Sequence, residues 1–155
     1  MNNQNLQKAT FGAGCFWHVE DKFMKMEGVI ETSVGFMGGD VKNPSYKMVC
    51  GGDTGHIEVT QIIYDPGRIS YNKLLKAFFA MHDPTQVQRQ GPDIGEQYSS
   101  IIFYHTKEQK KEAEKMKDEL EKSGKFGSTI ATRIEEATKF YKAEEYHQKY
   151  FQKNK

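Results

Sequence analysis

The sequence predicts an α/β (α+β) fold, a single-domain two-layer sandwich in which helices pack on a mixed β-sheet. Segments with strand and helix periodicity alternate along the chain. No repeat, low-complexity linker or internal boundary divides the 155 residues, a length that suits one domain with a real core. Two long glycine-rich stretches interrupt the pattern, so we also expect long functional loops, and a flexible N-terminus over residues 1–6.

The first third of the chain predicts a strand, a helix and a second strand. Lys8–Phe11 is short and extended. His18–Met26 predicts a helix, because apolar residues recur at helical spacing and no Gly or Pro interrupts them. Gly28–Phe36 alternates enough to predict a strand. Cys15 is therefore expected where a strand turns into a helix.

The middle of the chain combines an irregular stretch with a well-defined strand. Gly38–Gly55 is too long for an ordinary loop and is expected to be functional. Within it, Tyr46–Cys50 predicts a short helix capped by Ser45. His56–Tyr64 alternates, is rich in β-branched residues and predicts a strand.

The second half predicts further alternation of helices and strands. Ser70 caps a helix that runs to about His82, and a second glycine-rich loop follows over Asp83–Gly95. The remaining elements are a strand over Gln97–Tyr104, a charged helix over Lys107–Ser123, a strand over Ile130–Ile134 and a final helix over Lys142–Phe151, with Tyr146, Tyr150 and Phe151 on its apolar side.

Composition excludes several classes of function. The formal net charge is +1, from 22 basic and 21 acidic residues, so nothing indicates nucleic acid or an acidic surface as partner. No run is long enough to span a bilayer, and Met1–Gln7 is polar and lacks the core of a signal peptide. We expect a cytoplasmic monomer without a membrane partner.

Metal binding is not indicated either. The two cysteines, Cys15 and Cys50, form no Cys-x-x-Cys motif, and no His/Cys cluster has zinc spacing. His56 and Glu58 share one face of a predicted strand, but two ligands are too few for a metal site.

The stretch Gly12-Ala13-Gly14-Cys15-Phe16-Trp17 is the strongest candidate for chemistry. The free N–H groups and the dipole at the start of a helix favour a thiolate, which is the nucleophilic form of cysteine. The glycines allow close approach of the backbone. A lone cysteine in an apolar run is also commonly an inert, buried thiol. From this segment alone, both interpretations remain open.

Three other residues have suitable chemistry for such a nucleophile. Glu58 would be an acid with a raised pKa if aromatic side chains desolvate it. Tyr46 and Tyr98 can hydrogen-bond an oxygen without ionising at neutral pH. The constellation of a cysteine protease, with a histidine base and an orienting partner, is not recognisable around the available histidines, His56, His82, His105 and His147.

Seven short motifs follow one another from about residue 8 to about residue 151. They are Gly14-Cys15-Phe16-Trp17 with Glu20; Asn43-Pro44-Ser45-Tyr46 with Val49-Cys50; Thr54-Gly55-His56-x-Glu58; Tyr64-Asp65-Pro66; His82-Asp83-Pro84-Thr85; Gln90-Gly91-x-Asp93-x-Gly95-x-Gln97-Tyr98; and Ala143-Glu144-x-Tyr146-His147-Gln148. In these motifs the chain resembles the A-type peptide methionine sulfoxide reductases, enzymes that repair oxidised proteins.

The resemblance implies a single catalytic domain, 1–155, and a role for each motif residue. Cys15 corresponds to the nucleophile that attacks the sulfoxide sulfur and becomes a sulfenic acid. Glu58 corresponds to the acid that protonates the sulfoxide oxygen, and Tyr46 and Tyr98 to hydroxyls that bind that oxygen. Phe16 and Trp17 are expected to hold the methyl group on sulfur, and Asp93 to be an outer carboxylate that holds water.

The resemblance also implies the S epimer of methionine sulfoxide as substrate, free or in a polypeptide, and no metal or organic cofactor. The chain departs from the family pattern at Ser99, where an arginine is common, and in having no cysteine in a C-terminal tail. Cys50 is expected to be a buried structural thiol. The sulfenic acid would then be reduced by an external thiol, either thioredoxin or glutathione with glutaredoxin.

Two alternatives compete with this interpretation. Another enzyme with a cysteine nucleophile, such as a thiol hydrolase or an acyltransferase, would need a histidine paired with Cys15. A binder of oxidised methionine without enzymatic activity would use Cys15 only as a structural residue.

Overall fold

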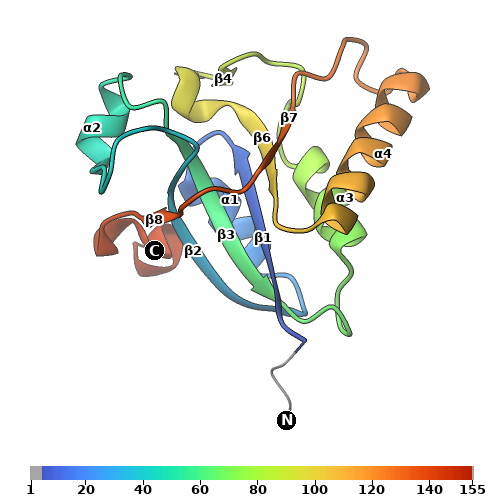
Figure 1. Cartoon of the computed structure of the whole chain (residues 1–155), viewed down its shortest axis with the longest axis horizontal. Coiled ribbons are helices and arrows are strands. Elements are labelled where there is room, and N and C mark those ends of the chain that lie inside the picture. The colour runs from blue at the N-terminus through green and yellow to red at the C-terminus, as the bar shows by residue number, and fades with distance from the viewer. Residues whose placement is uncertain (1–4, 155) are drawn as a thin grey trace.

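The computed structural model describes residues 5–154, so most of the predicted flexible N-terminus at 1–6 lies outside the described residues. A six-stranded sheet has the order β7-β6-β1-β3-β2-β8 (Figure 1). Only the β6–β7 pair is parallel, which confirms the predicted mixed sheet. The strands are β1 (Gln7–Ala13), β2 (Val29–Met37), β3 (Ile57–Tyr64), β6 (Ser100–Tyr104), β7 (Arg133–Glu136) and β8 (Tyr141–Lys142).

Three helices cover one face of this sheet and give the predicted two layers. They are α1 (Phe16–Met24), α3 (Tyr71–Ala80) and α4 (Lys107–Ser123). Phe11 of β1 lies at the centre of the shared core, where its ring stacks on Phe23 of α1 and Phe78 of α3, with centroids 5.3 and 5.1 Å apart. This burial of aromatic rings fixes α1, and with it the strand-to-helix turn that precedes it.

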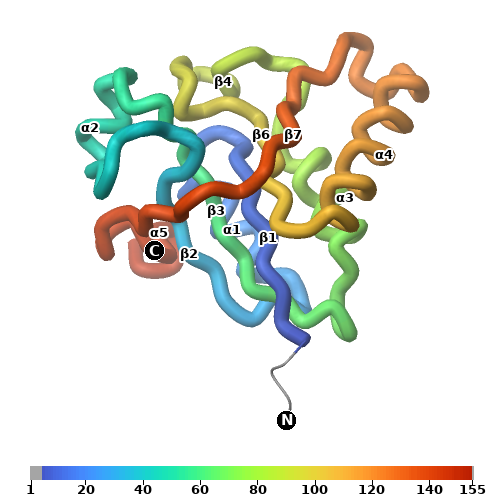
Figure 2. The backbone as a smooth tube through the Cα atoms, viewed as in Figure 1, coloured from blue at the N-terminus to red at the C-terminus, as the bar shows by residue number. Residues whose placement is uncertain are grey.

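The opposite face is crossed by the chain between β7 and β8, which leaves one edge of the sheet and joins the other (Figure 2). Phe140 and Ala137 of this crossing segment pack on the apolar side chains of that face, Met37, Ile57, Val59, Ile101 and Phe103. The crossing brings the C-terminal residues back beside β2 and α1.

Side-chain caps confirm three predicted helices. Ser45 accepts a hydrogen bond from Met48 N–H at 3.1 Å, at the start of the five-residue α2 (Tyr46–Cys50). Ser70 and Thr106 accept bonds from the third residue of α3 and α4 in the same way. A two-stranded ribbon, β4 (Arg89–Gln90) with β5 (Asp93–Ile94), lies in the second glycine-rich loop.

The predicted helix over Lys142–Phe151 is wrong. That stretch begins with the last residue of the edge strand β8 and contains a single turn, η2 (Glu145–His147), and the start of α5 (Tyr150–Lys153). Lys149 interrupts any helix there, because it has the left-handed conformation with φ +53°. Tyr146, expected on an apolar side, is 60% exposed. Contacts with β2 and α1 override the local helical periodicity.

Two strand boundaries also differ from prediction. Gln97–Tyr104 begins with the turn η1 (Glu96–Tyr98), and only Ser100–Tyr104 is strand. The strand expected over Ile130–Ile134 begins later, at Arg133. Within residues 5–154, no helix is long and apolar enough to cross a membrane, and no group of three or more His, Cys, Asp or Glu side chains is arranged to hold a metal ion.

Candidate active site

Cys15 caps the N-terminus of α1, at the strand-to-helix turn that the sequence predicts. Gly14, just before it, has φ +92°, and a Cβ there would come within 2.8 Å of the Gln90 side chain. A glycine is therefore required for the turn to pass beneath the β4–β5 ribbon. The Cys15 side chain is half-buried at this junction.

The Cys15 sulfur is a thiol at neutral pH. Its pKa is raised to about 11, mainly by burial; the charges of Glu58 and Asp93 also raise it, and the N–H groups of Trp17 and His18 lower it. The helix N-terminus acts in the predicted direction but is outweighed by desolvation. The expectation of a favoured thiolate in the resting protein is therefore wrong.

Glu58 lies beside this thiol on β3 and is 1% exposed. Its Oε1 accepts the Phe16 N–H at 3.3 Å, and its Oε2 has no hydrogen-bond partner among the described residues. Burial raises the pKa of Glu58 to about 8; the Phe16 N–H lowers it and the charge of Asp93 raises it. The raised pKa is confirmed: Glu58 is mostly a neutral carboxylic acid at pH 7.

The two tyrosines that were predicted to bind the sulfoxide oxygen, Tyr46 and Tyr98, lie near Glu58 and come from different segments of the chain. Tyr98 ends η1, and burial followed by the charge of Glu58 raises its pKa to about 12. Tyr46 begins α2, and burial raises its pKa above the ordinary range. Both phenols remain protonated and can donate hydrogen bonds. Since Asp93 and Cys15 also act on Tyr98, these groups form one cluster.

An aromatic wall completes one side of the cluster. The Phe16 ring lies 6.0 Å from Tyr46 and 5.7 Å from Phe36. The indole of Trp17 stacks on Tyr150 with centroids 3.8 Å apart and planes within 7°. The structure thus brings together the predicted Phe16 and Trp17, and Tyr150 from the C-terminal segment supports the indole.

His147 was considered in the sequence without a role, and the structure places it inside this wall. It is 1% exposed, its ring lies 4.3 Å from that of Tyr46, and Trp17 Nε1–H donates to its Nδ1 at 3.0 Å. Burial lowers its pKa, so the ring is neutral and Nε2 carries the hydrogen. This Nε2 has no partner among the described residues. The motif Tyr146-His147-Gln148 was the available signal.

Glu20, a motif residue to which the sequence assigned no role, anchors the C-terminal segment. It is 1% exposed and accepts the Thr32 hydroxyl at 2.7 Å and the Lys149 N–H at 2.6 Å. Gln148 adds bonds to both backbone groups of Val34, at 2.8 and 2.9 Å. These contacts hold His147 and Tyr150 against Trp17.

The predicted burial of Cys50 is wrong: its side chain is exposed. The five-residue α2 lies at the surface and buries only Val49, so its last residue faces solvent. The Cys50 thiol lies against the Tyr46 hydroxyl, on the same side of the site as the tyrosines. Ser99, where the family commonly has arginine, is buried and donates to Glu96 O at 2.7 Å.

The four buried or half-buried histidines do not pair with Cys15. His56 holds the ends of the 38–55 loop together through Gly39 N–H at 3.0 Å and Val41 O at 2.7 Å. His82 is bonded to Phe78 O and to Ser100 Oγ, and burial lowers its pKa to about 4. His147 bonds Trp17, and His105 bonds Thr10 at 2.8 Å. This disfavours a hydrolase or acyltransferase that would use one of these four rings as its base.

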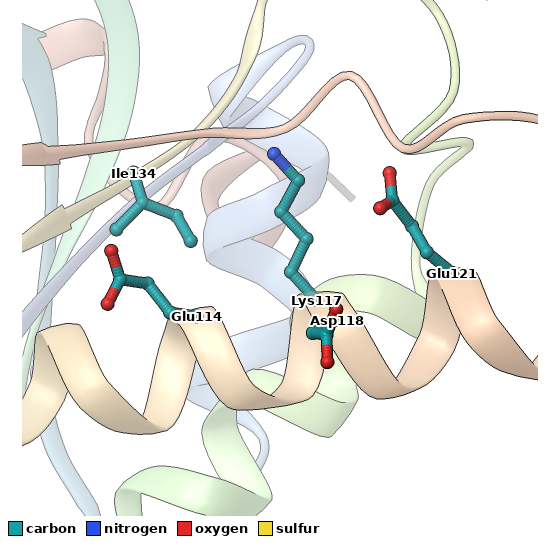
Figure 3. Close-up of a pocket in the computed structure, with 5 residues that line it drawn as sticks. All are labelled: Glu114, Lys117, Asp118, Glu121 and Ile134. Carbon is teal, nitrogen blue, oxygen red and sulfur yellow. The ribbon is translucent and has the colours of Figure 1, made fainter.

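Cys15 also lines a groove of about 350 Å³ whose walls do not include Glu58 or the two tyrosines. Asp93 of β5 lies in this groove, and its full lining is Ala13, Cys15, His18, Lys22, Met81, His82, Gln90, Gly91, Pro92 and Asp93. A hollow of about 380 Å³ elsewhere is lined by α4 and β7 and contains no nucleophile; Figure 3 shows its side chains, Glu114, Lys117, Asp118, Glu121 and Ile134.

Comparisons with known proteins agree with this geometry. A family model for peptide methionine sulfoxide reductase matches residues 7–155. A peptide methionine sulfoxide reductase MsrA of Methanoculleus marisnigri is 59% identical over 150 residues, which are 97% of this chain and 92% of the relative.

Solved structures give the same result. Mxr1 from Saccharomyces cerevisiae in reduced form has a TM-score of 0.92 and 40% identity, covering 99% of this chain and 88% of that one. Mxr1 in complex with Trx2 matches with a TM-score of 0.66 and 27% identity, over 96% and 87% of the two chains. The chain therefore belongs to the A-type peptide methionine sulfoxide reductases, oxidoreductases that reduce methionine sulfoxide and so repair oxidised proteins.

Proposed function

We propose that this chain reduces the S epimer of methionine sulfoxide, free or in polypeptides, through a sulfenic acid on Cys15. The observation that carries the proposal is the neutral carboxylic acid of Glu58 beside the Cys15 thiol. The Cys15 sulfur attacks the sulfoxide sulfur, and the oxygen passes to Cys15. In sum, a thiol and a sulfoxide become a sulfenic acid and a thioether, so that Cys15 is oxidised and methionine sulfur reduced.

This step requires proton transfer, because the thiol and the carboxylic acid are both neutral at pH 7. The sulfoxide oxygen takes the proton of Glu58 as the sulfur attacks. The thiol proton passes to the emptied carboxylate, so that Glu58 is restored. A carboxyl group has one donor and one acceptor oxygen for such an exchange, and the partnerless Oε2 is available for it.

The surrounding groups suit the two sides of a sulfoxide. Tyr46 and Tyr98 would donate to the oxygen, and Phe16 and Trp17 would hold the methyl group. When the sulfoxide sulfur faces Cys15, the oxygen faces the tyrosines and the methyl group faces the aromatic wall, only one epimer can bind. The family likeness identifies this epimer as S. Asp93 would act from further out, as a carboxylate that holds water.

The remaining functional assignments rest on the family likeness. Residues 1–155 would act as one catalytic domain, as a cytoplasmic monomer, with no metal or organic cofactor. An external thiol would reduce the sulfenic acid. The complex of yeast Mxr1 with Trx2 supports thioredoxin in this role, and glutathione with glutaredoxin is the second candidate.

The proposal is tested by one turnover without reductant, using stereochemically pure methionine sulfoxide. The S epimer should yield one methionine and add one oxygen to the intact protein mass, trapped at Cys15 by a sulfenic-acid reagent. Cys15→Ser should abolish both products, and the matched Cys50→Ser variant should retain most of this activity, because Cys50 is exposed and takes no part in the step. Equal loss in both variants, or turnover of the R epimer, would contradict the assignment.

A further inference from the structure

The groove on the Lys22 flank of Cys15 is separate from the groups that would receive the sulfoxide oxygen. Its lining contains Cys15 and Asp93 but not Glu58, Tyr46, Tyr98 or Phe16. Lys22 is exposed and makes no ion pair with any described residue. Its side chain is one of those that line the groove, together with His82 and Cys15.

Apart from Lys22, Asp93 and the exposed His18, the groove is lined by uncharged side chains, and two of these are held in place by hydrogen bonds. His82 is neutral and both of its ring nitrogens are bonded. The Gln90 side chain is held by Asp83 N–H and Asp83 O, at 2.7 and 2.9 Å. The groove therefore combines the Lys22 cation and His18, both on α1, with the reactive sulfur of Cys15 and the Asp93 carboxyl group.

Reduction of a sulfenic acid sets a geometric requirement. The incoming thiolate, the sulfur and the leaving oxygen must lie close to one line, as in thiol–disulfide exchange. If the oxygen stays among Glu58 and the tyrosine hydroxyls, the reductant must arrive from another side of Cys15. Cys50 lies against Tyr46, on the oxygen side, and is therefore badly placed to attack.

We propose that the groove lined by Lys22, His82 and Gln90 admits the reducing thiol to Cys15, and that Lys22 selects small thiols carrying a carboxylate. The inference rests on the sulfenic acid of the proposed function. The thiolate forms a mixed disulfide with Cys15, and the hydroxide leaves as water with a proton from Glu58. A second thiol then releases the Cys15 thiol and a disulfide.

The test compares three thiols of different charge on the sulfenic form: mercaptoacetate, 2-mercaptoethanol and cysteamine. The enzyme is first oxidised with one equivalent of methionine sulfoxide, and formation of the Cys15 mixed disulfide is followed by intact mass. Lys22→Glu should slow mercaptoacetate relative to 2-mercaptoethanol by about 3- to 10-fold and favour cysteamine, since one nearby charge steers the encounter. As salt rises, the rate of mercaptoacetate relative to 2-mercaptoethanol should become the same in Lys22→Glu as in the wild type.

Lys25→Glu is the matched control, because Lys25 caps the C-terminal end of α1 but pairs with Asp21 at 3.0 Å outside the groove. It should leave the ratio between thiols unchanged. Equal ratios for wild type and Lys22→Glu, or an equal shift in Lys25→Glu, would overturn the inference. Failure to trap any sulfenic acid in the wild-type enzyme would instead contradict the proposed function.

Discussion

Glu20 and Glu58 lie in two regions of the molecule and are equally buried, but their carboxyl oxygens differ in the hydrogen bonds that they accept. Each side chain is 1% exposed. Around Glu20, both oxygens accept short hydrogen bonds, from Thr32 and from the Lys149 backbone. Around Glu58, one oxygen accepts a long bond of 3.3 Å and the other has no described partner.

The difference separates a structural role from a chemical one. A buried carboxylate with a donor on each oxygen keeps its contacts and joins α1 to the C-terminal segment. A buried carboxyl with an unused oxygen is easier to keep protonated, and it remains free to exchange a proton with a bound substrate. Burial alone therefore does not identify the acid; the unsatisfied oxygen does.

The largest expected effect is on the rate of one turnover. Glu58→Gln keeps the shape of the side chain but removes the transferable proton, so the rate should fall by about 10²- to 10⁴-fold. Glu20→Gln should lose far less activity while it remains folded. Rapid-quench measurement of methionine, without reductant, gives both rates. Similar losses in the two variants would remove the functional contrast between these glutamates.

The pH dependence of that rate should follow Glu58 alone. Because its pKa is about 8, the acid form predominates at pH 7 and below, and the rate should fall about tenfold per unit above pH 8. Glu20→Gln should keep this profile and Glu58→Gln should flatten it. A wild-type rate that instead rises from pH 8 towards 11, the pKa of Cys15, would mean that free thiolate attacks.

Stability should change in opposite senses in the two variants. Glu20→Gln leaves one acceptor oxygen for two donors, the Thr32 hydroxyl and the Lys149 N–H, and should cost about 1–3 kcal/mol in the free energy of unfolding. The pKa of Glu58 in the folded protein is about 8, above its ordinary 4.5. Between these two pH values the folded protein binds a proton that the unfolded chain has lost, so the contribution of Glu58 to wild-type stability falls as the pH rises from 4.5 to 8.

Glu58→Gln removes that fall. Its stability relative to wild type should therefore improve by about 4 kcal/mol between pH 5 and pH 9, because the two pKa values of Glu58 differ over about three pH units of this interval. Urea unfolding of the wild type and both variants at these two pH values measures the differences. A constant difference between wild type and Glu58→Gln at both pH values would mean that Glu58 titrates normally.

The sequence predicts well those parts of the fold that local chemistry determines. The predicted caps Ser45 and Ser70 place α2 and α3, and the glycines before Cys15 place the strand-to-helix turn. The prediction of a C-terminal helix was wrong, because the conformation of that segment depends on residues far away in the sequence. Periodicity near Lys149 favours a helix, but the bond to Glu20, 129 residues away, holds a left-handed residue there.

The same limit applies to the candidate site. The motifs identify Cys15, Glu58, Tyr46 and Tyr98, and the structure gathers them. The wall formed by His147 and Tyr150 depends on contacts that no local pattern encodes. The thiolate was wrongly expected because a helix N-terminus is visible in sequence, whereas the burial that outweighs it is not.

The most direct test is to titrate Glu58 itself, by ¹³C NMR of enzyme labelled at the glutamate side-chain carboxyls. One resonance should titrate near pH 8 and be absent from Glu58→Gln but present in Glu20→Gln. That result would establish a neutral acid beside Cys15 at the pH of the cell. If every glutamate resonance has finished titrating below about pH 6, Glu58 is ionised at neutral pH and cannot be the proton donor.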